Sequence, residues 1–369
     1  MSKYPTIVTM MYDIRKMENC KNERNRKLEG YIEFSKKFLL TLPYPMILFI
    51  SPDDSYTKNA ILTVRGDLGL MDKTFIYELD FKYTYFYRHL SRLEDLQRSF
   101  FILNGDIKHE TPLYVILNNN KFCFIEQSIM LNPFKTTHFL WMDFGINHVA
   151  RNTENIHEWI TQIPDKIKQL CINPYIELDK PFYFFQNIHH NCAGGLFSGS
   201  AENMFKYCQL FKQKTEQIYN EGWYQIDEAV MTLVQLENLD MFEFFFGDYE
   251  GIVSNYLRPI ESIPLILAVM NKCIALNNPY WLYKILVFLE PYYLNMVKQN
   301  KRLEKNESLM NYINNSVVCD YYYNDCELRQ SIIDIINSLI SYANDDIKKF
   351  IEKSPNLQYY KNKDLVMKL

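Results

Sequence analysis

The sequence predicts an α/β fold, in which helices flank a parallel sheet, followed by an all-helical extension. Short β-branched and apolar runs alternate with segments of helical periodicity as far as residue 142. Strand, helix and strand in succession is the pattern of βαβ units, whose strands are parallel. After about residue 259 the strand signals stop and helical patterns follow one another. We therefore expect a sheet domain over residues 1–259 and a helical extension over residues 260–369.

The first half of the chain supplies the alternation. Residues 6–11 are predicted as the first strand, residues 25–42 as a helix that stops before Pro43, and residues 46–50 as the second strand. The next predicted elements are a strand at 74–79, a helix at 86–101, a strand at 113–117, a helix at 121–131 and a strand at 139–142.

The second half is less regular. Its predicted elements are a helix at 164–170, a strand at 182–185, a glycine-rich loop at 192–199, helices at 202–219 and 226–236, and a strand at 242–246. The extension has predicted helices at 264–275, 279–289, 303–313 and 328–342, and a charged tail at 348–369. The helical periods do not repeat cleanly, so the pattern does not indicate a solenoid.

Charge and composition narrow the class of protein. Apolar residues make up 48% of the 369 residues, which is enough for a large core. The chain has 40 basic and 44 acidic residues, a net charge of −4, which argues against a nucleic-acid protein with a broad basic face. The most basic segment, residues 15–27, also contains Glu18 and Glu23, and is better interpreted as a solvated helix start.

Three features of the sequence indicate where in the cell the protein is located. No charged region precedes an apolar core at the N-terminus, and no window of about 20 apolar residues exists, so we expect neither a signal peptide nor a transmembrane helix. The eight cysteines are scattered and form no Cys-x-x-Cys motif, which is typical of reduced, mostly buried thiols. We therefore expect a cytoplasmic protein.

A carboxylate at the end of the predicted central strand is the strongest candidate for a site. Residues 139–145 have the sequence Phe-Leu-Trp-Met-Asp-Phe-Gly, so Asp143 follows a deeply apolar run and Gly145 leaves room near the backbone. Ligands of open α/β sheets bind at the carboxyl ends of the strands. Asp143 can therefore bind a divalent cation or a ribose hydroxyl. The structural alternative is that it caps the following turn.

Two further segments have chemical content. The glycine-rich residues 194–199 can bring backbone N–H groups close to a sugar or phosphate, or can form a tight turn before a helix with Ser200 as its N-cap. Asp227 and Glu228 open an apolar helix. Their only role can be a favourable interaction with the helix dipole, or they can orient an acceptor hydroxyl and act as a general base.

Three polar features complete the set of candidates. Asp248 follows a glycine after an aromatic strand, where it is either a second metal or sugar ligand or part of a plain turn. Lys121 opens the helix before the central strand and can pair with a diphosphate, although most lysines are simply solvated. His189 and His190 are adjacent, so on a strand at most one of them can face the site.

Taken in order, these segments resemble the HtrL/YibB-like family, which is similar to the GT-A nucleotide-sugar glycosyltransferases. The resemblance rests on residues 6–14, 132–134, 139–146, 194–199, 227–230, 246–249 and 255–256. It covers roughly residues 5–260 and does not clearly include the helical extension. The resemblance implies a GT-A fold, a nucleotide-sugar donor, most often a UDP-sugar, and usually Mn²⁺ or Mg²⁺.

The same resemblance implies roles for individual residues. Asp143 takes the place of the first Asp of the Asp-x-Asp motif, and Gly145 stands where the second, metal-binding Asp would be. This departure puts metal dependence in question, although Asp143 and Asp248 together can still hold a cation. The expected donor-binding residues are Tyr12, Asp13, Lys121, Asp143, Gly145, Gly194 and Gly195. The expected catalytic residues are Asp227 and Glu228.

Three functions follow as hypotheses. The first is a glycosyltransferase of the hexosyltransferase type, which moves a sugar to a hydroxyl of a glycan or another acceptor. The second is a non-catalytic binding protein on a degenerate glycosyltransferase scaffold, with the helical extension binding a partner. The third, a nucleotidyltransferase, lacks a basic glycine-rich N-terminal loop to support it. The sugar, the acceptor, the stereochemistry and the oligomeric state, a homo-oligomer included, are left open.

Overall fold

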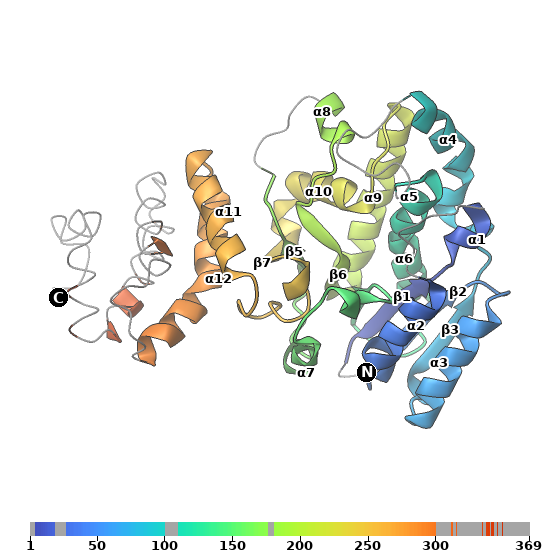
Figure 1. Cartoon of the computed structure of the whole chain (residues 1–369), viewed down its shortest axis with the longest axis horizontal. Coiled ribbons are helices and arrows are strands. Elements are labelled where there is room, and N and C mark those ends of the chain that lie inside the picture. The colour runs from blue at the N-terminus through green and yellow to red at the C-terminus, as the bar shows by residue number, and fades with distance from the viewer. Residues whose placement is uncertain are drawn as a thin grey trace. The chain divides into compact units, whose positions relative to one another are not determined.

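The computed structural model describes residues 4–18, 27–99, 110–175 and 181–299, with scattered residues beyond 300. The chain divides into two compact units, Met1–Phe244 and Phe245–Leu369 (Figure 1). The boundary predicted after residue 259 falls within the second unit and stays a prediction. The predicted helices at 303–313 and 328–342 and the tail at 348–369 lie largely outside the described residues.

A seven-stranded sheet forms the centre of the first unit, and its last strand reaches the boundary between the units. Its strands are β1 (Thr6–Met11), β2 (Met46–Ile50), β3 (Thr74–Glu78), β4 (His138–Met142), β5 (Ile167–Cys171), β6 (Cys192–Ser200) and β7 (Phe242–Phe246). The strand order is β3-β2-β1-β4-β6-β5-β7. Strands β1 to β4 are parallel to one another, as predicted, but β6 is antiparallel to both β4 and β5. The sheet is therefore mixed.

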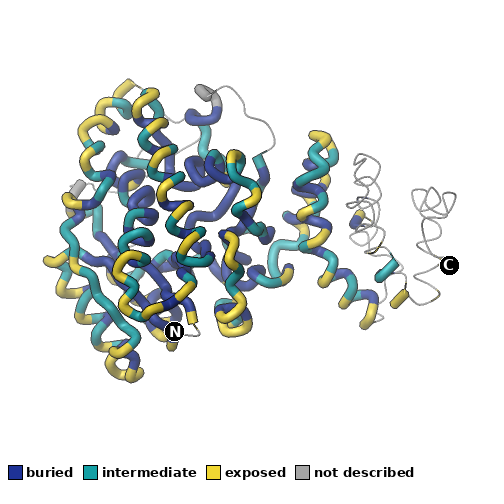
Figure 2. Tube along the Cα trace, turned by 180° about the vertical axis from the view of Figure 1, so that it is seen from behind, coloured by how far each residue is buried: buried dark blue, intermediate teal, exposed yellow. Residues whose placement is uncertain are grey.

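Helices cover both faces of this sheet. They are α1 (Ile14–Glu18), α2 (Leu28–Lys37), α3 (Ser55–Asp67), α4 (Leu90–Ser99), α5 (Pro112–Asn119), α6 (Lys121–Leu131), α7 (Ile156–Trp159), α8 (Pro181–Gln186), α9 (Ala201–Asn220) and α10 (Asp227–Glu237). The chain steps outward from β1 to β3 through α2 and α3, and returns to β4 through α4, α5 and α6. Because such crossovers are right-handed, the two groups lie on opposite faces. Buried residues follow the strands and the inner helix faces (Figure 2).

Most of the predicted elements exist in the structure. The predicted bounds of β1, β2, β7 and α6 are confirmed, and the helices predicted at 202–219 and 226–236 are α9 and α10. Two helices are shorter than predicted, because 3₁₀ turns replace one end of each. Leu39–Thr41 follows α2, and Tyr85–His89 precedes α4.

Two predicted strands are helices. Residues 113–117 belong to α5, where the Thr111 hydroxyl accepts a hydrogen bond from the Tyr114 N–H at 3.2 Å and Pro112 occupies the first turn. A capping threonine followed by proline is a strong helix start, and it outweighs the β-propensity of the apolar run. Residues 182–185 belong to α8, which also opens with a proline.

Two other predictions fail because tertiary pairing decides the conformation. The helix predicted at 164–170 is instead β5, whose five residues are all buried against neighbouring strands. The glycine-rich loop predicted at 192–199 is β6, which pairs with β4 on one side and β5 on the other. A Cβ on Gly199 would lie 2.9 Å from Ile167 Cδ1, so this glycine allows the two strands to approach closely.

Helices dominate the described part of the second unit. They are α11 (Ile263–Ala275) and α12 (Pro279–Lys298), which agree with the predicted helices at 264–275 and 279–289. Asn255 organises the segment before them: its amide oxygen accepts the N–H groups of Ile260 and Glu261, and its amide nitrogen donates to Phe246 O. Among the described helices, none is long and apolar enough to cross a membrane.

A buried arginine joins the outer strands of the sheet to α3. Arg65 is fully buried, and burial lowers the pKa of its guanidinium to about 10, which still leaves it charged at neutral pH. Its N–H groups donate to Thr74 Oγ1 and to the carbonyl oxygens of Leu42, Tyr44 and Lys73, at 2.6–3.1 Å. The guanidinium needs no carboxylate partner here, because these four oxygen atoms accept hydrogen bonds from its N–H groups.

We expect Arg65→Met to lower the free energy of unfolding by about 2–4 kcal/mol, because buried carbonyl oxygens lose their donors. Urea unfolding measures this loss. The matched control is Arg98→Met on α4, where the side chain is 74% exposed; its effect should stay within about 0.5 kcal/mol. Equal effects of the two substitutions would contradict the structural role of Arg65.

Candidate functional site

The ammonium group of Lys121 lies at the centre of a cluster of charged residues. Lys121 is the first residue of α6, and its side chain is 4% exposed. Its Nζ lies 2.9 Å from Asp227 Oδ2, 3.3 Å from Asp143 Oδ1 and 3.3 Å from the Gly194 carbonyl oxygen. These partners come from the start of α10, the end of β4 and strand β6. The structure therefore brings together four residues that the sequence indicated separately.

Asp143 is the exposed member of the cluster. Its side chain is 40% exposed, and its Oδ1 accepts a hydrogen bond from Trp141 Nε1 at 2.8 Å in addition to facing Lys121. Its backbone N–H continues the ladder to β6 by donating to Gly195 O. Among the described residues, its second oxygen, Oδ2, has no hydrogen-bond partner. One oxygen is thus fixed by the protein and the other is available to a ligand.

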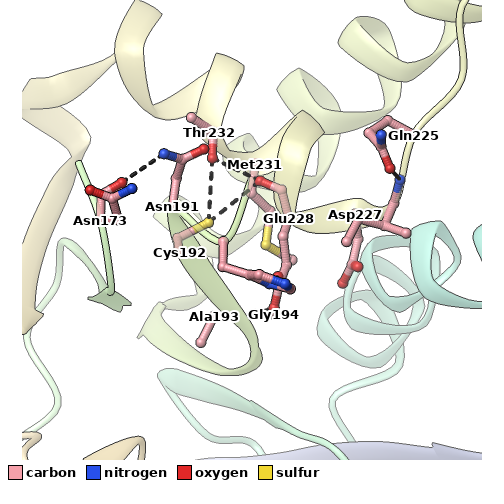
Figure 3. Close-up of polar contacts among 12 residues, drawn as sticks. Asn173, Asn191, Cys192, Ala193, Gly194, Gln225, Asp227, Glu228, Met231 and Thr232 are labelled. Carbon is pink, nitrogen blue, oxygen red and sulfur yellow. Dashed lines mark hydrogen bonds and ion pairs between the residues drawn. The ribbon is translucent and has the colours of Figure 1, made fainter. Parts of the chain in front are cut away.

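Glu228 extends the cluster along β6. Its Oε1 accepts the Gly194 N–H at 2.9 Å, and its Oε2 lies 3.3 Å from His190 Nδ1. Figure 3 shows Asp227 and Glu228 pointing down from the start of α10, with Glu228 above Gly194 and Cys192 Sγ facing the Glu228 carbonyl oxygen. His189 instead stacks on Phe184. The two histidines lie between α8 and β6 and not on a strand, so the strand alternation used in the prediction does not apply to them.

Burial and mutual charge shift the ionisation of this group. Burial raises the pKa of Asp227, and the negative charges of Glu228 and Asp143 act in the same direction, against Lys121. Although burial opposes it, the carboxylates of Asp143 and Asp227 raise the pKa of Lys121, so the ammonium stays charged. The hydrogen bond to Glu228 raises the pKa of His190. Perturbed pKa values of this kind are typical of functional sites.

Gly194 and Gly195, two of the three glycines predicted to bind a donor, have structural roles. A Cβ on Gly194 would lie 2.5 Å from Asp227 Oδ2, and its N–H and C=O are already bonded to Glu228 and Lys121. Gly195 accepts the Asp143 N–H. Gly194 is therefore needed for the carboxylates to reach the strand, and donor binding by either glycine stays a prediction.

Tyr12 and Asp13 lie at the carboxyl end of β1. The Tyr12 ring is buried, stacks on Phe124 and donates its hydroxyl to Leu79 O at 2.9 Å. Asp13 forms an ion pair with Arg15 at 2.7 Å, and its side chain is 12% exposed. Tyr12 thus belongs to the core. The predicted binding of a nucleotide-sugar donor by Tyr12 and Asp13 stays a prediction.

The space beside Gly145 is filled by an aromatic ring. A Cβ at Gly145 would lie 2.6 Å from Tyr31 Cδ1, so the ring of Tyr31 on α2 occupies the volume of any side chain there. Ser35, one turn further along α2, donates its hydroxyl to Phe144 O. Helix α2 therefore packs against the segment that follows Asp143 and holds it in place. An aspartate at position 145 would require the Tyr31 ring to move.

Asp248, the second predicted metal ligand, belongs to the other unit. Its Oδ1 accepts the Glu250 N–H at 2.9 Å and the Ser262 hydroxyl at 2.6 Å, so it caps a turn there. Within the described ranges, no group of three or more His, Cys, Asp or Glu side chains could hold a metal ion. Joint metal binding by Asp143 and Asp248 stays a prediction.

Two tyrosines near the site, Tyr31 and Tyr114, were missed from the sequence. Tyr114 lies in the first turn of α5, and its ring is partly exposed, yet burial of its hydroxyl and the negative charge of Asp227 raise its pKa. Glu228 and Asp143 act on the same hydroxyl. Because residues 113–117 were predicted as a strand, nothing in the sequence placed this tyrosine beside α10. The only available signal was the Thr111-Pro112 helix start.

Comparison with known proteins gives the family. A family model described as "Bacterial protein of unknown function (HtrL_YibB)" matches residues 3–255. The chain belongs to the HtrL/YibB family. Protein HtrL of Escherichia coli (strain K12) is 22% identical over 258 residues, which are 66% of this chain and 87% of the relative. The family match includes every residue of the cluster around Lys121, and its description assigns no activity.

We expect Gly145→Ala to destabilise this HtrL/YibB family member by about 1–3 kcal/mol, because the new methyl group overlaps the Tyr31 ring. The matched control is Gly30→Ala on the same helix as Tyr31. A Cβ there meets nothing within 4 Å, so alanine should be neutral or slightly stabilising. Urea unfolding of Gly145→Ala, Tyr31→Ala and the double variant measures the coupling. Strict additivity would contradict the overlap.

The His190–Glu228 pair predicts a pH dependence. The raised pKa of His190 means that the charged pair is complete below the ordinary histidine pKa of about 6.5 and is lost as pH rises through the raised value. An NMR titration should give His190 a higher pKa in the wild-type chain than in Glu228→Gln. Identical titration curves in the two chains would show that Glu228 does not hold the proton on His190.

Proposed function

We propose that this chain is a glycosyltransferase with a GT-A-like sheet, which transfers a sugar from a nucleotide-sugar donor, most simply a UDP-sugar, to a hydroxyl acceptor. The observation that carries the proposal is the gathering of Asp143 and Asp227 around one buried lysine, with Glu228 beside them on the Gly194 N–H. The cluster lies where β4 ends, and in open α/β sheets that edge is where ligands bind. Three carboxylates from distant segments are more than a fold needs for capping.

Asp143 supports the donor side of the proposal. Its Oδ2 faces outward, while Oδ1 is fixed by Trp141 and Lys121. This donor set fits Mn²⁺ or Mg²⁺, because such ions are often held by one or two carboxylates and take their other ligands from substrate phosphates and water. When bound, the cation would neutralise charge on the diphosphate leaving group. The residue holding it would be Asp143.

Asp227 and Glu228 support the acceptor side. Their side chains are 5% and 10% exposed, at the edge of the same cluster. In the proposed reaction the acceptor oxygen bonds to the anomeric carbon while the bond from that carbon to the diphosphate oxygen breaks. The proton of the acceptor hydroxyl passes to one of these carboxylates, which acts as a general base.

A second candidate function has one observation in its favour. Tyr31 fills the space beside Gly145, so the second position of the Asp-x-Asp motif is closed as well as altered. This favours the alternative in which the chain is a non-catalytic binding protein on a degenerate glycosyltransferase scaffold. The helical extension would then be the interaction module. The expected cytoplasmic location belongs to both candidates and is likewise a proposal.

The two candidates are separated by thermal-shift measurements with UDP-sugars, with and without Mn²⁺, since a ligand stabilises only the state that binds it. A glycosyltransferase should show a Mn²⁺-dependent rise in Tm with at least one donor. Asp143→Asn should remove that rise and lower turnover at least about a hundredfold, with the unliganded Tm unchanged within a few degrees. The control is Asp240→Asn, an exposed carboxylate outside the cluster. If no nucleotide sugar shifts the wild-type Tm, the binding-protein alternative is favoured.

A further inference from the structure

Two hydrogen bonds and one ion pair within the protein engage the ammonium group of Lys121. An ammonium group has three N–H donors and no acceptor. Three oxygen atoms, from Asp227, Asp143 and Gly194, lie within 3.3 Å of Nζ. The side chain is 4% exposed and is already surrounded by these oxygens, so a phosphate has no open path to reach it. The predicted pairing of Lys121 with a diphosphate is therefore disfavoured by its geometry.

The same contacts connect elements that are far apart in sequence. Asp227 lies 106 residues from Lys121, and Gly194 lies 73 residues from it. Without a cation between them, Asp143 and Asp227 would be neighbouring carboxylates that repel each other, and Asp227 would be a buried charge without a counter-ion. The Lys121 ammonium therefore fixes the positions of the Asp143 and Asp227 carboxylates.

Trp141 orients the carboxylate group of Asp143. Its indole N–H donates to Asp143 Oδ1, the same oxygen that faces Lys121, and its ring lies 6.0 Å from Nζ. The indole hydrogen bond and the ion pair with Lys121 act on one oxygen and fix the rotation of the carboxylate. The other oxygen, Oδ2, is then the one presented to solvent.

We propose that Lys121 is a positioning residue, which holds Asp143 and Asp227 against a single ammonium group and leaves contact with the ligand to Asp143 Oδ2. Its charge acts on a bound donor only through Asp143. This inference rests on the proposed donor site, but the packing role of Lys121 does not. The two parts are therefore tested by different measurements.

The first measurement uses the unliganded protein. Lys121→Met strands the buried carboxylate of Asp227, so it should unfold at a clearly lower urea concentration than wild type or fail to fold. The double variant Lys121→Met/Asp227→Asn has no stranded charge and should recover a large part of the loss. Purely additive effects would overturn the positioning role, whether or not the chain binds a nucleotide.

The second measurement is a double-mutant cycle on UDP affinity with MnCl₂ present, by calorimetry or ligand-detected NMR. Asp227→Asn is the reference chain, and Lys121→Met is added to it with either Asp or Asn at position 143. We expect loss of Lys121 to weaken binding at least tenfold, about 1.4 kcal/mol, with Asp143 present, and less than twofold with Asn in its place. Equal losses in both backgrounds would show direct contact with the phosphates and overturn the proposal.

A crystal structure of the wild-type chain with UDP and Mn²⁺ decides the same point independently. Lys121 Nζ should keep Asp227 and Asp143 as its partners, and a phosphate oxygen within hydrogen-bond distance of Nζ would overturn the proposal. If UDP does not bind to the wild-type chain at all, the proposed function fails. The unfolding measurements on the unliganded chain still decide whether Lys121 positions the two carboxylates.

Discussion

The buried contact between Lys121 and Asp227 is the interaction on which the rest of the site depends. A lysine and an aspartate that are both almost fully buried are costly to desolvate, and breaking such a pair costs several kcal/mol because the remaining charge has no partner. The pair is satisfied here because Asp143 and the Gly194 carbonyl supply further oxygens. Helix α6, strand β6 and helix α10 are thus held in one arrangement by this buried polar centre.

Glycines make this centre sterically feasible. Gly194 lets Asp227 and Glu228 lie against β6, since a Cβ would overlap the Asp227 carboxylate. Gly145 accepts the Tyr31 ring in the same way. Both glycines were interpreted from the sequence as clearance for a ligand, yet each of these spaces is filled by a side chain of the protein itself. A glycine in a motif shows that something approaches the backbone closely, but it does not show what.

The sequence predicted the parts of the site that depend on local pattern. Asp143 does follow a buried strand, and Asp227 and Glu228 do open an apolar helix. It failed where long-range pairing decides, because β5 and β6 are strands only through their antiparallel contact with each other and with β4. The meeting of Lys121 and Asp227 has no local signal at all. Tyr31 on α2 and Tyr114 on α5 were missed for the same reason, because each comes close to the site only through long-range packing of its helix.

The formal charges of the cluster bear on what it can bind. Lys121 contributes one positive charge, and Asp143, Asp227 and Glu228 contribute three negative charges, so the sum is −2, or −1 when His190 is protonated. The ammonium is enclosed, whereas Asp143 and His190 are exposed, so an approaching diphosphate meets negative charge first when His190 is neutral. Such a ligand would be repelled unless it arrives with a cation. The enclosed lysine lowers the negative charge of the cluster, but it does not offer the diphosphate an accessible cation.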